Sequence, residues 1–216
     1  AVRFLATSQA SFAAGARLGP ALVRAVACFD RVPAAPGRRP KVAIFGALYV
    51  RDNDVFNQDL VRAIEEAGGE AVVTPPADYA RIVVGELRAR WRLEAMYQPL
   101  LVFGTLVGLL DRMDRHYHRH AARFLGPYRP IRMDGADAFL RRFGVRTEHS
   151  GESVENLLKI HHLVREHPDL RLFVQASPAF CCPSLVTEAM ARDIQRATGV
   201  PVVSLTYDGT GRYRND

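Results

Sequence analysis

Two adjacent cysteines, Cys181 and Cys182, are the residues of this sequence best suited to chemistry. They lie in the segment Ala176-Ser-Pro-Ala-Phe-Cys-Cys-Pro-Ser184, between an apolar run and a predicted helix. Pro183 fits the first turn of a helix, because its missing N–H would have no partner there anyway. The cysteines would then lie at the helix N-terminus, where free backbone N–H groups and the helix dipole stabilise a thiolate. A thiolate can ligate a metal or act as a nucleophile, so metal ligation, redox sensing and an inert buried pair all stay open.

This chain holds too few ligands to complete a metal site by itself. Zinc is usually held by four nitrogen or sulfur ligands, and an iron–sulfur cluster by three or four thiolates. The third cysteine, Cys28, lies on a separate alanine-rich segment and is interpreted as structural. The alternating histidines at 116, 118 and 120 lie among arginines and are interpreted as a solvated helix face. Further cluster ligands would therefore come from sequence outside this chain or from a partner.

Four apolar runs, each ended by glycine, proline or polar residues, predict buried strands. Helical spacing of apolar residues lies between them. We therefore expect two strand–helix–strand units with right-handed crossovers, and an α/β fold with a three-layer, doubly wound parallel sheet. The predicted strands are 41–46, 70–75, 170–175 and 201–206, and the predicted helices of these units begin near Asp54, Ser153 and Pro183.

The remaining segments predict more helix than two such units require. Residues 78–125 read as one long helix, or two broken near Pro99, and form a helical insertion. The apolar run 99–110 is predicted to be a buried helix, since it is shorter than the roughly 20 residues of a membrane span. Residues 1–40 read as a helical segment and a linker, and 41–216 as the α/β domain. The absence of an initiator Met and the uncapped end indicate a fragment of a larger protein.

In an open parallel sheet, ligands bind beyond the carboxyl ends of the strands, where the strand order reverses. The loop with the two cysteines lies at this edge. The loop Tyr207-Asp-Gly-Thr-Gly211 also lies there, and it could either cradle a phosphate or form a simple turn. Its glycine spacing departs from that of a dinucleotide-binding loop.

The composition excludes some classes of function. The net charge is +6, and of the 29 basic residues only Lys41 and Lys159 are lysines. The arginines are spread along the chain, which disfavours a nucleic-acid-binding stripe and suits an acidic ligand such as coenzyme A. Three cysteines form no disulfide framework, which indicates a reducing, cytoplasmic compartment.

Three segments also resemble a known family. Ser177-Pro-Ala-Phe-Cys-Cys-Pro-Ser184 resembles the Ser-Pro-Phe-x-Cys-Met-Pro segment of 2-hydroxyacyl-CoA dehydratase and benzoyl-CoA reductase subunits and of large activase-related proteins. The segment from Val202 to Gly211 resembles the strand and loop that follow it. Lys41-Val-Ala-Ile-Phe-Gly-Ala-Leu-Tyr-Val-Arg51 resembles their Gly-Glu-Ile-Tyr-Val-Arg element, with Ala47 in place of the glutamate.

The resemblance implies a Rossmann-like domain that holds a [4Fe-4S] or related cluster and takes part in low-potential electron transfer to an acyl-CoA. It implies part of a lyase or reductase system, an ATP-dependent activase as partner, and a dimer, with no nucleic acid and no membrane. It places Cys181 on the family cysteine and Cys182 where methionine is usual, both as metal-ligand candidates. The candidate cofactor-binding residues are Tyr49, Arg51, Asn53, Ser177, Pro178, Asp208 and Gly209.

Two alternatives to the function that the resemblance implies remain open. The chain could be a non-catalytic α/β scaffold of a larger protein, or a thiol redox-sensing module that uses Cys181 and Cys182. A change in thiol count without bound iron would distinguish the sensing module. The substrate and the catalytic residues do not follow from the sequence.

Overall fold

The structure is a computed structural model, and it describes residues 18–33, 37–131, 135–146, 149 and 151–210. The chain divides into two compact units. One comprises residues 38–101 and 131–216, and the other comprises residues 1–37 and 102–130. The first unit holds the sheet and every candidate site residue named above, so it is treated first.

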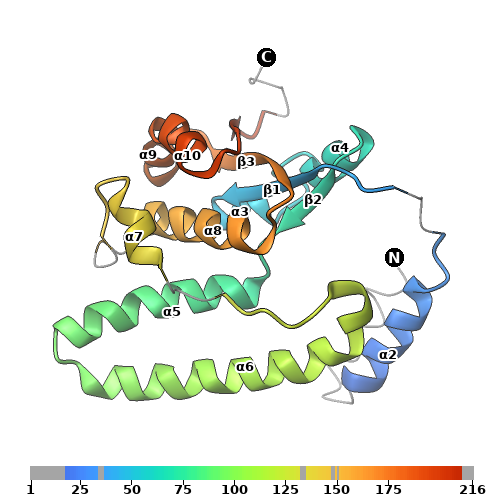
Figure 1. The fold of residues 1–216 in the computed structure, drawn as a ribbon, viewed down its shortest axis with the longest axis horizontal. Coiled ribbons are helices and arrows are strands. Elements are labelled where there is room, and N and C mark those ends of the chain that lie inside the picture. Colours follow the sequence, from blue (N-terminus) through green and yellow to red (C-terminus); the bar gives the residue numbers. More distant parts are fainter. Residues whose placement is uncertain (1–17, 34–36, 132–134, 147–148, 150, 211–216) are drawn as a thin grey trace. The chain divides into compact units, whose positions relative to one another are not determined.

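All four strands of the sheet run parallel to their neighbours, and their spatial order is β2-β1-β3-β4 (Figure 1). The bounds are β1 (Lys41–Gly46), β2 (Glu70–Val73), β3 (Leu170–Pro178) and β4 (Val202–Tyr207). The two central strands are apolar on both faces and are covered on both faces, as a parallel sheet requires. The predicted α/β class with a three-layer, doubly wound parallel sheet is confirmed.

Two layers of helices cover the sheet. On one face, Phe45 and Phe173 stack edge to face with ring centroids 5.9 Å apart and pack with residues of α7 (Ala136–Arg141), α8 (Glu152–Glu166) and α10 (Ala191–Thr198). Figure 1 shows α7 and α8 together on this side. On the other face, Ile44 and Val174 pack with residues of α3 (Leu48–Arg51) and α4 (Leu60–Glu66).

The predicted start of a helix near Asp54 is wrong. Residues 52–59 form turns, because two asparagine side chains compete for the backbone groups that a helix would use. Asn53 Oδ1 accepts hydrogen bonds from the N–H groups of Val55 and Phe56. Asn57 Nδ2 donates to the carbonyls of Val50 and Arg51, and only after these turns does α4 begin.

Three other helical segments differ from the sequence prediction. Helix α7 lies between α6 and α8, where the sequence predicts no helix. The helix α8 has Gly151 at its N-cap position, whereas Ser153, near the predicted start, donates its hydroxyl to the carbonyl of Pro183 at 3.3 Å. The helix predicted to begin near Pro183 is two helices, α9 (Cys182–Ala189) and α10, which meet at Met190. Gly199 closes α10 with φ 74°, as is common for a glycine after a helix.

The predicted helical insertion consists of two helices. They are α5 (Pro76–Leu93) and α6 (Tyr97–Leu125), and they separate at Ala95, whose φ is 54°. Pro99 lies in the first turn of α6, so the break near Pro99 is confirmed.

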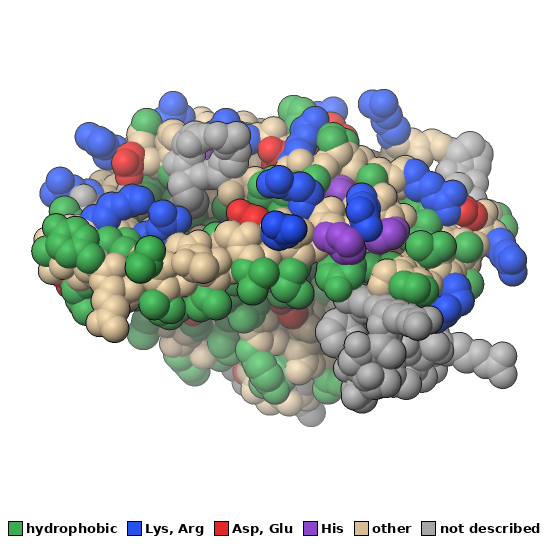
Figure 2. Space-filling model, turned by 90° about the horizontal axis from the view of Figure 1, so that it is seen from below, with side chains coloured by type: hydrophobic (Ala, Val, Ile, Leu, Met, Phe, Trp, Pro, Cys, Tyr) green, Lys and Arg blue, Asp and Glu red, His purple; other side chains and the backbone are tan. Residues whose placement is uncertain are grey.

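The predicted burial of the apolar run 99–110 is wrong. None of the residues of α6 is buried, and Leu101, Leu106 and Leu109 are each more than half exposed. Figure 2 shows hydrophobic side chains along this helix. Apolar composition suggested burial, but a helix face is buried only where another element covers it. Apart from the helix's own neighbouring backbone, no described residue lies within 4 Å of a Cβ added at Gly104 or Gly108.

The other unit holds α2 (Leu18–Phe29) and most of α6. Within it, the Arg123 guanidinium pairs with the Asp30 carboxylate, and the rings of Phe29 and Phe124 meet edge to face. Cys28 is exposed on α2. The helix predicted before residue 18 lies outside the described residues.

Candidate functional site at the carboxyl edge of the sheet

The switch point of the sheet lies between β1 and β3. The chain passes from β1 to β2 on one side and reaches β3 and β4 on the other, and ligands of open α/β sheets bind beyond the carboxyl ends of strands at such a point. Gly46 ends β1 with φ 117°, and a Cβ placed there would lie 2.2 Å from the Ala176 carbonyl oxygen. The Ala47 N–H donates to that same oxygen at 3.1 Å. Only glycine allows this close approach of the two central strands.

The two cysteines follow the carboxyl end of β3. Phe180, with φ 63°, turns the chain after the strand, and Cys181 then caps α9, whose first residue is Cys182. Both thiols are free, Cys181 partly and Cys182 largely exposed. The predicted position of the cysteines at a helix N-terminus is confirmed, and a buried inert pair is excluded by their exposure.

A pair of polar side chains lies behind the cysteine loop. Gln175 on β3 donates its Nε2 to the Ser184 carbonyl at 2.8 Å, and both side chains are buried. Gln175 Oε1 and Ser184 Oγ have no hydrogen-bond partner among the described residues. Buried polar atoms are nearly always paired, so this edge of the sheet has polar groups that the described chain leaves unsatisfied.

The candidate residues after β1 separate into two environments. Arg51 is fully buried and forms a two-point ion pair with Asp52, with both N···O distances 2.8 Å. Its Nη2 also lies 3.4 Å from the Thr74 carbonyl. Tyr49 is largely exposed and packs against the Phe56 ring, while the side chain of Asn53 is used in the turn described above. Arg51 alone of these three points into the protein.

The remaining candidates lie after β3 and β4. Ser177 is buried and Pro178 is partly exposed at the end of β3. After β4, the Asp208 carboxylate accepts hydrogen bonds from the backbone N–H and the hydroxyl of Thr210, at 3.0 and 2.7 Å. Gly209 has φ 80°. The segment 208–210 is therefore a turn closed by its own side chains.

A cluster of polar and ionisable side chains, most of them buried, lies near the same edge, and the sequence analysis did not identify it. We call it the Lys159 cluster, and it comprises Arg51 of α3, Tyr79 and Glu86 of α5, and Glu155, Asn156 and Lys159 of α8. The Lys159 ammonium lies over the Tyr79 ring, 4.8 Å from its centroid, and its Nζ is 3.5 Å from Asn156 Oδ1. Lys159 and Asn156 are wholly buried, and the two glutamates are at most 8% exposed.

Burial raises the pKa values of both carboxyl groups of this cluster. Burial, reinforced by the Glu155 carboxylate, raises the pKa of Glu86 to about 8, against a weaker opposing hydrogen bond from the Gly151 N–H. Burial also raises the pKa of Glu155. Burial first, and the Glu155 carboxylate second, raise the pKa of Tyr79 to about 12. At neutral pH, Glu86 is therefore mostly protonated and Tyr79 fully so.

Lys159 shows the opposite shift. Burial first, and the positive charge of Arg51 second, lower the pKa of Lys159 to about 8. The Glu155 carboxylate acts in the opposite direction with a smaller effect. Strongly shifted groups of opposite type, gathered beside a switch point, are typical of functional sites. The Lys159 cluster is therefore the second component of the candidate site.

Metal ligation must be judged from the described residues alone. They include no group of three or more His, Cys, Asp or Glu side chains placed to hold a metal ion. His116 and His120 have ring centroids 6.1 Å apart on α6, and His118 lies 2.9 Å from the Gly126 carbonyl. The two cysteines could thus provide only part of a cluster site.

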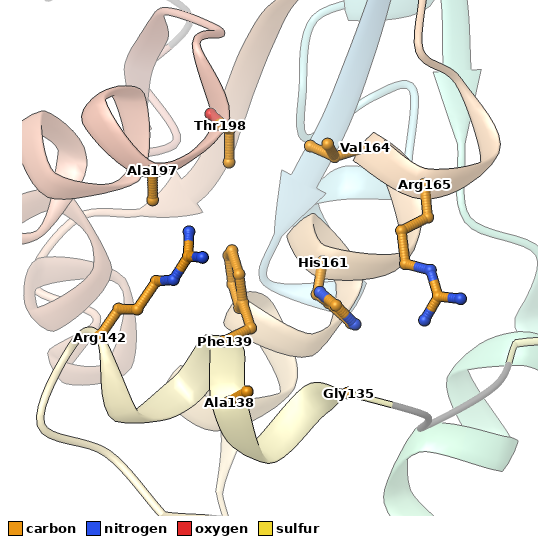
Figure 3. Close-up of a pocket in the computed structure, with 9 residues that line it drawn as sticks. All are labelled: Gly135, Ala138, Phe139, Arg142, His161, Val164, Arg165, Ala197 and Thr198. Atoms are coloured by element: carbon orange, nitrogen blue, oxygen red, sulfur yellow. The ribbon is translucent and has the colours of Figure 1, made fainter.

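A pocket lies at the opposite, amino edge of the sheet. It has a volume of about 240 Å³ and adjoins the C-terminal ends of α8 and α10, just before β3 and β4. In Figure 3, Phe139 of α7 points toward Ala197 and Thr198 of α10, and His161 of α8 lies beside them. The rings of Phe139 and His161 lie in the pocket with centroids 5.0 Å apart, and Arg142 and Arg165 also line it.

Comparisons with known proteins did not identify a related protein. No family model, curated protein or solved structure matches the chain. The helices that the structure describes include none that is both long and apolar enough to cross a membrane. The resemblance noted from the sequence therefore stays a prediction, and the site must be judged on its own chemistry.

The sequence predicts the position of the cysteines at a helix N-terminus, but it does not predict the Lys159 cluster. Glu155, Asn156 and Lys159 lie on the helix predicted to begin near Ser153, and the sequence analysis assigned none of them to a site. One signal was present in the composition, since Lys159 is one of two lysines among 29 basic residues. Lysine differs from arginine in that its pKa shifts readily on burial, so a rare lysine in an arginine-rich chain indicates a position to inspect.

Proposed function

We propose that this chain is the iron–sulfur cluster-binding portion of a protein of the 2-hydroxyacyl-CoA dehydratase and activase-related type. In this proposal Cys181 is a cluster ligand, and the cluster passes electrons at low potential to an acyl-CoA. The observation that carries it is the pair of free, solvent-reachable thiols at the N-terminus of α9, beside the switch point of the sheet. The acyl-CoA and the ATP-dependent activase enter through the sequence resemblance alone.

The surroundings of the thiols support a ligand role. The first turn of α9 presents backbone N–H groups and the positive end of a helix dipole, which attract negative charge. Phe180, Leu185 and Val186 are all exposed beside the cysteines, and Phe180 is 91% exposed. Exposed apolar side chains around a ligand suit a surface that is covered by further protein. Such a cover would keep water away from a bound cluster.

The fit is partial. Two neighbouring thiols supply at most two of the three or four thiolates that a cluster takes. Cys28 belongs to the other compact unit, and no third ligand adjoins the pair among the described residues. The proposal therefore requires ligands from residues outside the described part of the chain or from a partner. A bound cluster would supply one-electron transfer, while Cys181 holds it and the apolar rim excludes water.

The experiment is iron and acid-labile sulfide analysis of protein purified without oxygen. We expect both to be bound by the wild-type chain with its partner, and both to fall to background in Cys181→Ala. Cys28→Ala is the matched control, because it removes a thiol from an exposed helix of the other unit. Full iron and sulfide content in Cys181→Ala would disprove the proposal.

A thiol redox sensor is the second candidate, favoured by the adjacency of two free thiols. It requires no iron, and it predicts the reversible loss of two titratable thiols upon oxidation. Thiol counting on the metal-free protein distinguishes the two. Loss of both thiols in wild type but not in Cys182→Ala, with no iron bound, would support the sensor over the cluster.

A further inference from the structure

Lys159 is a buried cation without an ion-pair partner in the described chain. Its interactions are the long contact to Asn156 Oδ1 and the contact with the face of Tyr79. No carboxylate oxygen of a described residue forms a salt bridge with it, although an ammonium has three N–H donors. Burial of a charge is costly unless the charge is paired and hydrogen-bonded, and this ammonium has one long hydrogen bond for its three donors.

Two further donors in the Lys159 cluster also lack acceptors. Arg51 Nη1 and Asn156 Nδ2 are buried and have no hydrogen-bond partner among the described residues. Asn156 is in contact with Lys159. Arg51 Nη2 lies 3.4 Å from the carbonyl of Thr74, five residues before Tyr79, and Lys159 lies over the Tyr79 ring. The unsatisfied donors thus come from two helices, α3 and α8, and the charge of Arg51 acts on Lys159.

We propose that Arg51, Asn156 and Lys159 form a binding site for a small oxyanion, a carboxylate or a phosphate group. Such a group carries several acceptor oxygens and a negative charge, which are what these donors lack. It would also relieve the repulsion between two buried cations, because only Arg51 has a carboxylate partner, Asp52. The inference does not depend on the iron–sulfur proposal, since none of the three residues is a thiol.

One of the two glutamates of the cluster, Glu86, carries little negative charge at neutral pH. Glu86 is mostly protonated there, and the pKa of Glu155 is raised as well. The charged or titratable groups that act on the site from α3, α5 and α8 and their flanking residues are Arg51, Asp52, Tyr79, Glu86, Glu152, Glu155 and Lys159.

The site has a characteristic pH dependence. As the pH rises through about 8, Lys159 loses its positive charge and Glu86 gains a negative charge. Both changes weaken the binding of an anion. Two protons are therefore linked to binding, and the affinity should fall by up to about a hundredfold per pH unit above pH 8, rather than about tenfold for one proton.

The experiment uses the whole chain labelled with ¹⁵N at the lysine side chains. Because there are two lysines, the spectrum has two side-chain signals, and Lys41→Met assigns them. Acetate and inorganic phosphate are titrated separately at pH 6.5 and constant ionic strength, with chloride as the reference anion. We expect a saturable shift of the Lys159 signal and an unchanged Lys41 signal. A response to acetate alone identifies a carboxylate site, and a response to phosphate alone a phosphate site.

Variants of the other two donors test the geometry. Arg51→Met should weaken binding about tenfold to a hundredfold, as expected for the loss of a charge-assisted hydrogen bond. Asn156→Leu has a similar volume and should weaken it about two- to tenfold, so the test stands even if Arg51→Met does not fold. A Lys159 signal that responds to neither anion would show that water alone fills the site, and an equal response to chloride would show an unselective effect of anions. Either outcome would overturn the proposal.

Discussion

The two ends of α8 lie at opposite edges of the same sheet and differ in what they bury. Its N-terminal half, at the carboxyl edge, buries Glu155, Asn156 and Lys159. Its C-terminal half, at the amino edge, contributes His161, Val164 and Arg165 to an open pocket. One helix therefore carries a buried charged face at one end and an ordinary partly exposed face at the other.

The difference indicates where this molecule departs from what stability alone favours. Ionisable groups without ion-pair partners reduce stability when they are buried, and natural sequences keep them mostly at functional sites. At the amino edge, the Lys41 ammonium and Asp169 carboxylate are 3.1 Å apart and both reach solvent. The same residue type, lysine, is thus paired and exposed at one edge and unpaired and buried at the other. Four substitutions test this contrast.

Gly46→Ala should have the largest effect, because it breaks the carboxyl edge itself. The added Cβ would meet the Ala176 carbonyl at 2.2 Å and force a positive φ on alanine. We expect the free energy of unfolding to fall by at least about 3 kcal/mol, measured by urea denaturation. Gly144→Ala is the control, since its φ is 69° but no described atom lies within 4 Å of the new Cβ. It should lose about 1 kcal/mol. Equal losses in both variants would contradict the close approach of β1 and β3.

Lys159→Met should remove a pH dependence that only the buried lysine causes. With a folded-state pKa of about 8 against an unfolded value of 10.5, the cost of burying Lys159 is absent above pH 10.5. It grows to about 3 kcal/mol as the pH falls to about 8. We expect the free energy of unfolding of Lys159→Met to lack this decrease. A variant that retains the wild-type slope would show that a group other than Lys159 causes the pH dependence.

Glu86→Gln should flatten the pH profile in a different interval. The raised pKa of Glu86 means that its stabilising contribution is complete below pH 4.5 and is lost as the pH rises through about 8. The wild-type protein should therefore lose about 2 kcal/mol between pH 5 and pH 8, after allowance for partial screening. Glu86→Gln should not show this loss of stability between pH 5 and pH 8. Glu94→Gln, at an exposed end of the same helix, should keep the wild-type profile.

Lys41→Met should have the smallest effect. It removes the exposed ion pair with Asp169 at the amino edge, and exposed ion pairs contribute little to stability. We expect an unfolding midpoint in urea that is indistinguishable from that of the wild type. A destabilisation as large as that of Gly46→Ala would show that the contrast between the two edges is wrong.

The sheet was predictable from the sequence because each strand is a short apolar run closed by residues that end strands. The run 41–46 with its terminal glycine is an example, and β1 has those bounds. The position of the cysteines followed from Pro183 for the same kind of local reason. The start of α4 was not predictable from periodicity, since Asn53 and Asn57 replace helical hydrogen bonds with side-chain bonds.

The rest of the candidate site could not be predicted, because periodicity identifies polar faces but not their burial. Glu86 and Lys159 lie on different helices, more than 70 positions apart in the chain. Only the packing of α5 and α8 brings them into one cluster. The predicted burial of the apolar run of α6 was wrong for the converse reason. The exposure of Leu101 and Leu106 depends on which elements are present to cover them.

The helix α5 provides both aromatic and acidic members of the Lys159 cluster, and it also carries Trp91, the single tryptophan of the chain. Intrinsic fluorescence excited at the indole therefore reports on this one helix, whereas circular dichroism averages over all of them. If α5 separates from the sheet before global unfolding, its emission should shift to the red at a lower urea concentration than the loss of ellipticity. Two coincident transitions would instead indicate a single cooperative unit.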